Sequence, residues 1–297
     1  MENTQKAYFQ LHTSVILWGF TAILGKLISI SALTLVWWRM FITSACLLVI
    51  LLIMNKLTKL STLNKKNVYK VMGIGCLVAL HWLAFYGAIK LANASVAVVC
   101  ISTMSLFTAI LEPLIRKTAF QWSELLIGVA IVPAMMLIVN HLDTNMTLGI
   151  VVGLLAAVLS TSFSILNKIM LQEVEPLPMT FIEIGSGALF LTLFMPFFIY
   201  QNPDAPLLPN SIDFFYLILL SVFCTVIPYI MSLAALQKLN PFTVALSINL
   251  EPIYTIVLAW LLLHEDKELN IQFYWGVAII IGSVFLEPLL KKYLKRL

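Results

Sequence analysis

The stretch PFTVALSINLEPIYTIVLAWLLLHE, residues 241–265, is long and apolar enough to cross a lipid bilayer, yet it carries a carboxylate, Glu251, near its midpoint. A membrane-spanning helix needs about 20 predominantly apolar residues. An ionised carboxylate at the bilayer centre costs about 2.5–3.5 kcal/mol on insertion scales, so this side chain is expected to be sheltered, paired or protonated. Glu251 therefore predicts a site inside the membrane.

Polar residues accompany Glu251 on the same helical face. Asn249 and Pro252 lie beside it, and Ser247 and Thr255 lie one helical turn away on either side. A polar stripe in an apolar span needs a cavity or a partner helix. We therefore expect Glu251, Asn249, Ser247 and Thr255 to contribute to substrate binding or coupling.

The composition of the whole chain is that of an integral membrane protein. Of its 297 residues, 61% are hydrophobic and 11% are charged, whereas a soluble domain has roughly 25% charged residues. The pattern predicts an all-α membrane protein with ten transmembrane helices, at residues 12–31, 34–54, 68–89, 91–112, 121–140, 147–169, 178–200, 212–237, 241–263 and 270–290.

No cofactor or metal site is expected. The four cysteines lie inside apolar segments without the spacing of a metal site. The segment HEDKE at 264–268 lacks the second histidine of the zinc motif HExxH. Nucleic-acid binding has no support either.

The distribution of basic residues predicts the orientation in the membrane. If the N-terminus is cytoplasmic, the inside segments hold Lys6, Lys56, Lys59, Lys65, Lys66, Lys70, Arg116, Lys117, Lys168, Lys238, Lys291, Lys292, Lys295 and Arg296. The outside connections hold Lys90 and Lys267. Because cytoplasmic loops are enriched in Lys and Arg, both termini are predicted to be cytoplasmic, in a cell membrane whose anionic lipids suit the net charge of +4.

The chain contains an internal repeat. Residues 85–111 align without a gap to residues 232–258, and ILGK at 23–26 resembles ILNK at 165–168. We therefore predict two halves, 1–140 and 141–297, of five spans each. Because five is odd, the second half is inverted in the membrane, and in such folds substrates bind near the midplane where the halves meet. Glu251 aligns with Met104, so only one half supplies this carboxylate.

Several short motifs carry a family resemblance across the whole chain. They are LWGFTAILGK at 17–26, Arg39 early in the second span, ANASVAVV at 92–99, NPFTVALS at 240–247 and EPIYTIVLAWLLLHE at 251–265. This pattern resembles the EamA-type ten-span exporters of the drug/metabolite transporter superfamily. The family usually closes the last motif with Gly-Glu, whereas this chain has His264-Glu265 and, in its first half, Lys117-Thr118.

The resemblance implies a central cavity lined by both halves, with the fifth and tenth spans at the periphery. It also implies alternating access. Export of amino acids or related metabolites is common among such relatives.

Aromatic and titratable residues suggest further contacts with a substrate. His81 and Trp82 lie in the third span with Tyr86 one turn further on, and Tyr229 follows Pro228 in the eighth. The aromatic rings could form a cavity wall that offers cation–π contacts. A buried neutral His81 bonded to a backbone carbonyl is an equal alternative, and the aromatic residues could equally be core.

Charged residues near the span ends suggest gates. Lys26 and Arg39 are expected toward the outer ends of their spans, where they either snorkel to the interface or form a gate. Their repeat counterparts, Lys168 and approximately Glu183, are predicted to pair as an inner latch. Pro228 and Pro252 interrupt their spans and are candidate hinges.

The function predicted from these features is secondary transport of a small metabolite, driven by protons or by exchange. The chain has no GxxxxGK motif, and no enzymatic activity is expected. A flippase for lipids or lipid-linked precursors is the alternative, and an intramembrane enzyme is a weaker one. The expected partners are the bilayer and a small-molecule substrate, and a homodimer is left open.

Overall fold

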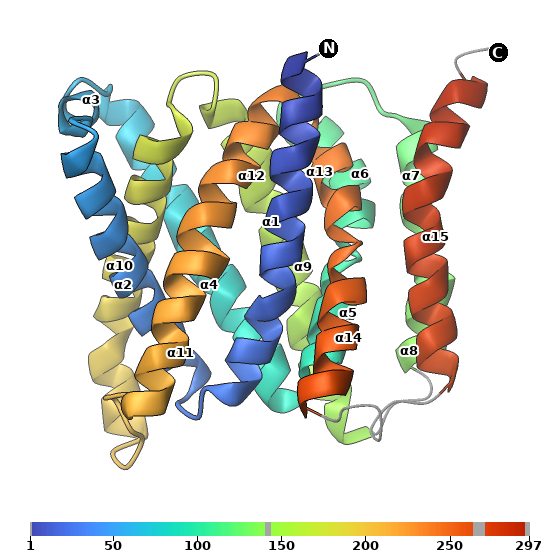
Figure 1. Ribbon diagram of the computed structural model, residues 1–297. Coiled ribbons are helices and arrows are strands. Elements are labelled where there is room, and N and C mark those ends of the chain that lie inside the picture. Colours follow the sequence, from blue (N-terminus) through green and yellow to red (C-terminus); the bar gives the residue numbers. More distant parts are fainter. Residues whose placement is uncertain (1, 140–143, 264–270, 295–297) are drawn as a thin grey trace.

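A computed structural model describes residues 2–139, 144–263 and 271–294, and within these ranges every regular element is a helix (Figure 1). The helices are α1 (Glu2–Leu27), α2 (Ala32–Ile53), α3 (Leu57–Ser61), α4 (Lys65–Leu91), α5 (Ala94–Ile101), α6 (Met104–Arg116), α7 (Trp122–Val129), α8 (Ile131–Val139), the 3₁₀ helix η1 (Thr144–Met146), α9 (Thr147–Met170), α10 (Pro176–Gln201), α11 (Ser211–Ser221), the π-helical turn η2 (Val222–Val226), α12 (Ile227–Lys238), α13 (Pro241–Ile248), α14 (Glu251–Leu263) and α15 (Ile271–Leu294).

These helices confirm the predicted all-α membrane fold. In the described chain, eight helical segments are long and apolar enough to cross a membrane. Two shorter apolar segments, Trp122–Leu137 and Ile271–Leu286, lie where the fifth and tenth spans were predicted. One boundary differs clearly, because α1 begins at Glu2 and ends at Leu27 rather than covering 12–31. Hydropathy marks only the apolar part of a helix, and the polar first turns contain no residue that would end it.

The two halves enter the fold from opposite sides. In Figure 1, α1 starts at the side that carries the N-terminus, whereas α9, the first long helix of the second half, starts at the opposite side. The last described turn of α15 lies on the same side as the start of α1. The fold therefore has the inverted arrangement that an odd number of spans per half requires, and the first and last described turns of the chain lie on one side.

The fourth and ninth spans are each broken into two helices at equivalent positions. The N-cap residues Asn93 and Asn240 accept hydrogen bonds from the backbone N–H groups of Val96 and Thr243, three residues on in each case. One half breaks at residues 102–103, between α5 and α6, and the other at 249–250, between α13 and α14. Each break lies within a segment that is long and apolar enough to cross a membrane, Ala94–Arg116 and Pro241–Leu263, so both predicted spans are present and each contains a break that was not predicted.

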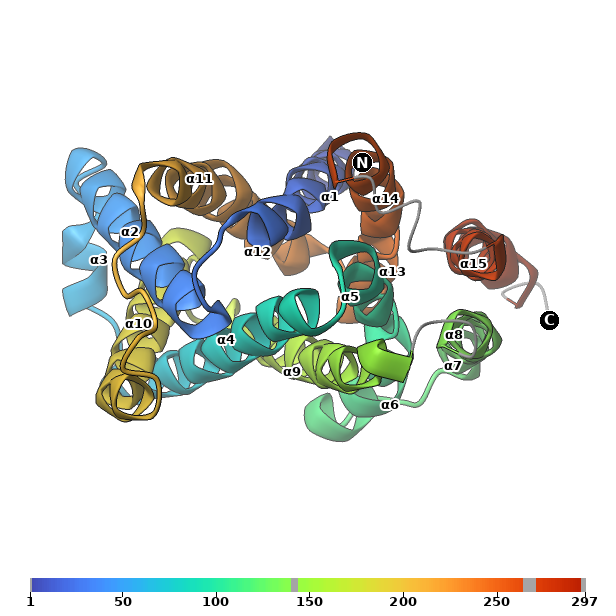
Figure 2. The same cartoon turned by 90° about the horizontal axis from the view of Figure 1, so that it is seen from below.

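The remaining helices surround the centre unevenly. Helices α7, α8 and α15 pack against one another at one edge of the molecule, as the view from below shows (Figure 2). Helices α4 and α9 form the largest helix contact, and α1 lies against α12 and α14. The expected peripheral position of the fifth and tenth spans is thus found, and the centre is left to spans from both halves.

Small residues allow α9 to pack closely against the end of α4 and the start of α5. A Cβ atom added at Gly149 would lie 2.7 Å from the Cβ of Ala92, and one added at Gly153 would lie 2.8 Å from the Cβ of Cys100. Both distances are shorter than van der Waals contact. The glycines of α9 therefore let the second half approach the junction of α4 and α5 closely.

Candidate functional site

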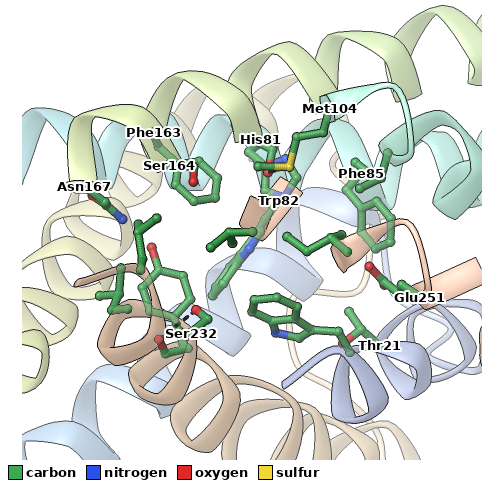
Figure 3. A pocket seen from close by; sticks show the side chains of 18 of the residues that line it. Thr21, His81, Trp82, Phe85, Met104, Phe163, Ser164, Asn167, Ser232 and Glu251 are labelled. Carbon is green, nitrogen blue, oxygen red and sulfur yellow. Dashed lines mark hydrogen bonds between the residues drawn. The ribbon is translucent and has the colours of Figure 1, made fainter. Parts of the chain in front are cut away.

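A cavity lies between the two halves and contains about 810 Å³ of space not filled by atoms, part of it open to the outside. Figure 3 shows that aromatic and apolar side chains form most of its wall, with a few polar groups between them. The cavity is lined by Trp18, Thr21, Arg39, His81, Trp82, Phe85, Ile101, Met104, Ser160, Phe163, Ser164, Asn167, Tyr229, Ser232, Leu233, Leu236, Val244, Ile248 and Glu251.

Glu251 is the acidic residue of this cavity wall. It is the first residue of α14, directly after the break in the ninth span, and its side chain is only 6% exposed. Figure 3 places its carboxylate in the ring of lining side chains, on the same side as Phe85 and Thr21. Among the described residues, no hydrogen bond or ion pair to this carboxylate is present. The helix break thus presents an unpartnered acidic group to the cavity, and the N-terminal end of α14 favours negative charge there.

Met104 occupies the equivalent position in the first half. It is the first residue of α6, and it also lines the cavity. Its backbone carbonyl accepts a hydrogen bond from Thr161 of α9 at 3.2 Å. The two broken spans therefore bring a thioether and a carboxylate to the same cavity from symmetry-related positions.

Arg39 is buried in the cavity wall, so it does not snorkel to the interface, and its alternative role as a gate stays a prediction. The side chain is 2% exposed, and its Nε and Nη1 atoms donate hydrogen bonds to Thr225 at 2.9 Å and to the Tyr86 hydroxyl at 2.8 Å. The guanidinium also lies 3.8 Å from the centre of the Trp82 ring. A longer hydrogen bond runs from Nη2 to the carbonyl oxygen of Cys224, at 3.4 Å. These contacts connect α2 to α4 and to the π-helical turn η2, and each of the three guanidinium nitrogens donates one hydrogen bond.

The predicted inner latch between Lys168 and Glu183 does not form. The Lys168 ammonium donates hydrogen bonds to the backbone carbonyls of Leu236 and Leu239, at 2.6 and 2.7 Å, and of Gln237 at 3.1 Å. A lysine at the C-terminal end of a helix satisfies carbonyls that have no partner within the helix. Lys168 therefore binds the end of α12.

Glu183 is fully buried on α10, where one of its carboxylate oxygens accepts a hydrogen bond from the Tyr229 hydroxyl at 2.8 Å. Tyr229 lines the cavity, and its ring makes an edge contact with Trp82, at 6.4 Å between the ring centres. Glu183 therefore reaches the cavity through Tyr229.

His81 both lines the cavity and bonds to a backbone carbonyl, so the two alternatives for this residue are combined. Its Nδ1 atom lies 2.8 Å from the carbonyl oxygen of Ala156, to which it donates in the tautomer that carries the Nδ1 hydrogen. The ring packs against Phe85 and Phe163 and lines the cavity. Of the other two aromatic candidates on α4, Trp82 lines the cavity, whereas Tyr86 does not and instead accepts a hydrogen bond from Arg39.

The polar stripe around Glu251 does not face the cavity. The Thr255 hydroxyl donates to the carbonyl oxygen of Gly19 on α1 at 3.0 Å, and the Ser247 hydroxyl donates within its own helix to Thr243. The Asn249 side chain lies 3.2 Å from the hydroxyl of Ser105, so it connects the two helix breaks. None of the three lines the cavity with Glu251. Of the two surroundings expected for the stripe, a cavity or a partner helix, Asn249 and Thr255 have a partner helix, and a role of the three residues in substrate binding or coupling stays a prediction.

The two proline candidates also take other positions than expected. Pro252 is the second residue of α14, where the lack of an N–H group leaves no hydrogen bond unmade. Pro228 follows the π-helical turn η2 on α12, and its carbonyl oxygen accepts a hydrogen bond from Ser14 at 2.9 Å. The deformations therefore lie just before the prolines, and a hinge role for either stays a prediction.

A separate polar cluster ties the connection between α1 and α2 to the rest of the protein, at the side of the molecule opposite the N-terminus (Figure 1). Asp213, at the start of α11, is 2% exposed and accepts hydrogen bonds from the N–H and hydroxyl groups of Ser29, at 2.9 and 2.6 Å. The Lys90 ammonium donates to the carbonyl oxygen of Ile28. Lys26, in contrast, is exposed and lines no part of the cavity, so its gating role stays a prediction.

Sequence reasoning missed several residues of this site. Asn167 precedes Lys168 in the ILNK repeat motif, where the lysine carries the stronger signal because it is charged. Trp18 and Thr21 lie in LWGFTAILGK, whose residues mark the family resemblance but no particular contact. In the separate cluster, Asp213 is an acidic residue at the start of a strongly apolar span, and a carboxylate in such a span is the same kind of signal as Glu251. No group of three or more metal-ligating His, Cys, Asp or Glu side chains occurs in the described part of the chain. The segment 264–268 lies outside it.

Comparisons with known proteins agree with this architecture. A crystal structure of a protein superposes over 98% of this chain and 99% of its own, with a TM-score of 0.72 and 14% sequence identity, which shows that the fold is shared. An uncharacterized transporter from Synechocystis sp. is 22% identical over 227 residues, which cover 75% of this chain and 67% of that protein.

The sequence model of the EamA-like transporter family matches the chain twice, at residues 5–140 and 147–287. The two matches cover most of both halves. This integral membrane protein therefore belongs to the EamA-like transporter family.

Proposed function

We propose that the protein is a secondary transporter that exports small amphipathic metabolites carrying an amine, such as amino acids or related compounds, across the cell membrane by alternating access. The observation that carries this proposal is the unpartnered Glu251 carboxylate in a cavity between two inverted halves. In transporters of this general construction, substrates bind at the junction of the halves, where broken helices expose polar groups.

The charges of the cavity favour an amine as the group that is recognised. Arg39 is engaged by Tyr86 and Thr225, so its charge is held by the protein itself. Glu251 has no such partner, and an ammonium group would supply one. A charge-assisted hydrogen bond of this kind is about twice as strong as a neutral one.

The walls of the cavity favour an apolar or aromatic remainder. Trp18, Trp82, Phe85 and Phe163 present ring surfaces to the cavity, and Met104 lies opposite in the first half. Small-molecule sites combine predominantly apolar walls with a few polar groups that fix the orientation. An amphipathic substrate with its amine at Glu251 would place its apolar part against these rings, where cation–π contacts also stabilise a bound ammonium.

The proposal is tested by measuring metabolite efflux from cells that express the wild-type protein or the Glu251→Gln variant. Mass spectrometry of the medium would identify metabolites that appear faster than from cells with an empty vector. We expect Glu251→Gln to reduce that excess at least tenfold, since it removes the charge that binds the amine. Glu251→Met, which installs the side chain of the first half, should do the same without disturbing the fold.

Glu175→Gln is the matched control, because Glu175 is an exposed carboxylate outside the cavity. It should export like the wild type. Wild-type efflux from Glu251→Gln at equal protein level in the membrane would contradict the role of Glu251. No difference between wild type and empty vector for any metabolite would contradict transport, and a difference confined to lipids would favour the flippase.

A further inference from the structure

Three buried polar atoms beside the cavity lack hydrogen-bond partners. They are Oε1 of Glu183 and both amide atoms, Oδ1 and Nδ2, of Asn167. The two side chains are fully buried, and the amide lies next to the carboxylate. An unsatisfied buried polar atom costs roughly 1–3 kcal/mol, and such groups in a native fold call for an explanation.

The chemistry of the two groups supplies that explanation. An ionised Glu183 needs a donor for its free oxygen, and the Asn167 Nδ2 group is one. A protonated Glu183 needs an acceptor for its O–H group, and the Asn167 Oδ1 atom is one. Because an amide carries both functions and exchanges them by rotating about its last bond, Asn167 can satisfy either protonation state of the carboxyl group.

The other carboxylate oxygen connects Glu183 to the cavity. Tyr229 donates its hydroxyl hydrogen to Oε2, and the Tyr229 ring lies on the cavity wall against Trp82. Trp82 in turn carries the Arg39 guanidinium on its face. Trp82 and Tyr229 occupy equivalent positions when the repeat alignment is extended by three residues, and Arg39 and Glu183 are approximately equivalent. The four side chains therefore form a row across the junction of the halves.

Among the side chains that the structure describes, no fixed charge neutralises Glu183. The helices packed against α10 include α4, α2 and α12. Arg39 of α2 is bonded to Tyr86 and Thr225, and His81 of α4 lies on Ala156. Lys168 of α9 binds the carbonyls at the end of α12. Tyr229 is therefore the titratable side chain that contacts Glu183 directly, and burial without a counter-charge favours the protonated acid.

We propose that Glu183 is the residue that takes up and releases the coupling proton of this transporter, while Glu251 binds the substrate. Asn167 satisfies Glu183 in both protonation states, and Tyr229 transmits contact with a substrate in the cavity to it. This inference rests on the proposed transport function. In each cycle the carboxylate takes one proton from the compartment that the cavity faces and releases it as a proton on the other side.

Infrared difference spectra of the purified protein at acidic and alkaline pH test the protonation without any substrate. We expect a carboxylic acid C=O band in the wild type that disappears in Glu183→Gln and persists in Glu251→Gln. In Tyr229→Phe the band should shift in frequency, because the hydroxyl hydrogen bond to the carboxyl group is lost. Glu183→Asp, which keeps an acid at the site, should retain a band. Identical spectra for the wild type and Glu183→Gln would overturn the proposal.

Transport by protein reconstituted in liposomes tests the coupling. The probe is a mixture of L-amino acids, followed by mass spectrometry, with either an imposed pH gradient or an internal amino-acid pool that permits exchange. Glu183→Gln should lose accumulation driven by the pH gradient, by at least tenfold, and keep exchange. Glu251→Gln should lose both.

Gradient-driven accumulation by Glu183→Gln at the wild-type level would contradict the proposal, as would loss of exchange in a variant whose thermal stability is normal. Transport by Tyr229→Phe should also be measured as a function of pH, because removing the hydroxyl group should move the pH at which transport is half-maximal. If the wild type moves no amino acid in either assay, amino acids are not its substrates and that part of the proposed function is refuted. The infrared experiment still decides whether Glu183 exchanges a proton.

Discussion

Gly25 and Tyr86 show how one missing side chain positions a charged residue. A Cβ atom added at Gly25 would lie 2.4 Å from the Cε1 atom of the Tyr86 ring. The ring fills the space beside α1, and its hydroxyl accepts the hydrogen bond from Arg39. The glycine in LWGFTAILGK is therefore needed for the close approach of α1 and α4, which in turn fixes the guanidinium in the cavity wall.

Gly25→Ala should lower the free energy of unfolding by about 1–3 kcal/mol, because overpacking forces the buried ring or the backbone to move. Thermal unfolding in detergent, followed by tryptophan fluorescence, would measure the change. Gly73→Ala is the matched control, since nothing lies within 4 Å of an added Cβ atom there. A Gly25→Ala protein as stable as the control would mean that the ring yields without cost.

The sequence predicted residues of this site well when their chemistry was unusual for a membrane, and poorly when their partners decided their role. Glu251 could be found because a carboxylate in an apolar span is rare. For Arg39 the sequence left two roles open, snorkelling to the interface or forming a gate, because long basic side chains often snorkel. Its burial depends on Tyr86, Thr225 and Trp82, which come from other helices and cannot be assigned as partners without the fold.

At the scale of elements, a buried acidic residue of α11 helps to hold the connection between α1 and α2. Asp213→Asn replaces an acceptor oxygen by an NH₂ group that faces the donors of Ser29. Hydrogen bonds to a charged group contribute about 1.5–3 kcal/mol. We therefore expect backbone amides near residues 28–31 to exchange their hydrogen roughly tenfold faster or more, measured by mass spectrometry.

The control for this experiment is Asp204→Asn, in the exposed segment that precedes α11. It should leave the exchange of residues 28–31 unchanged. Equal exchange in Asp213→Asn and wild type would show that other contacts hold the connection.

The short helix α3 is joined to the connection between α9 and α10 by an exposed ion pair. The hydrogen bond from Lys59 lowers the pKa of the Glu175 carboxyl group below its ordinary value. A carboxyl group with a lowered pKa in the folded state stabilises the fold above its unfolded pKa, and this contribution is lost as the pH falls through the folded value.

Glu175→Gln should therefore lower the thermal midpoint slightly at neutral pH and not at all once the pH is well below about 4. The effect is small because exposed pairs contribute little. Thermal unfolding of both proteins over a pH series measures it. A difference that grows as the pH falls would have the wrong sign for this pair.

The breaks in the fourth and ninth spans could not be predicted from the sequence, although the equivalence of the two spans could. Repeat alignment placed residues 85–111 on 232–258 correctly, and Asn93 and Asn240 turn out to cap equivalent helices. Hydropathy did not reveal the breaks at 102–103 and 249–250, because both halves of each broken span are apolar. The breaks rest on side-chain contacts such as that of Asn249 with Ser105, which join segments far apart in the sequence.

For the whole molecule, the number of spans and the inverted halves could be predicted, because membrane-spanning length and duplication are written in the sequence itself. The orientation in the membrane is still a prediction from the basic residues. We expect a fluorescent protein fused to the C-terminus to fluoresce in bacterial cells, and alkaline phosphatase fused there to be inactive. An active phosphatase fusion would place the termini outside.

The equivalence of the two helix breaks has a consequence for the conformational cycle. If the two halves exchanged their conformations, the result would be the same fold inverted in the membrane, with the cavity closed at the opposite end. The backbone alone would then make the two states equal in free energy. Any difference would then come from contacts that differ between the two ends, such as Asp213 with Ser29 at one end and Lys168 with the carbonyls of α12 at the other. If the protein works by the proposed alternating access, substitutions of these end contacts should therefore shift its resting direction without touching the cavity.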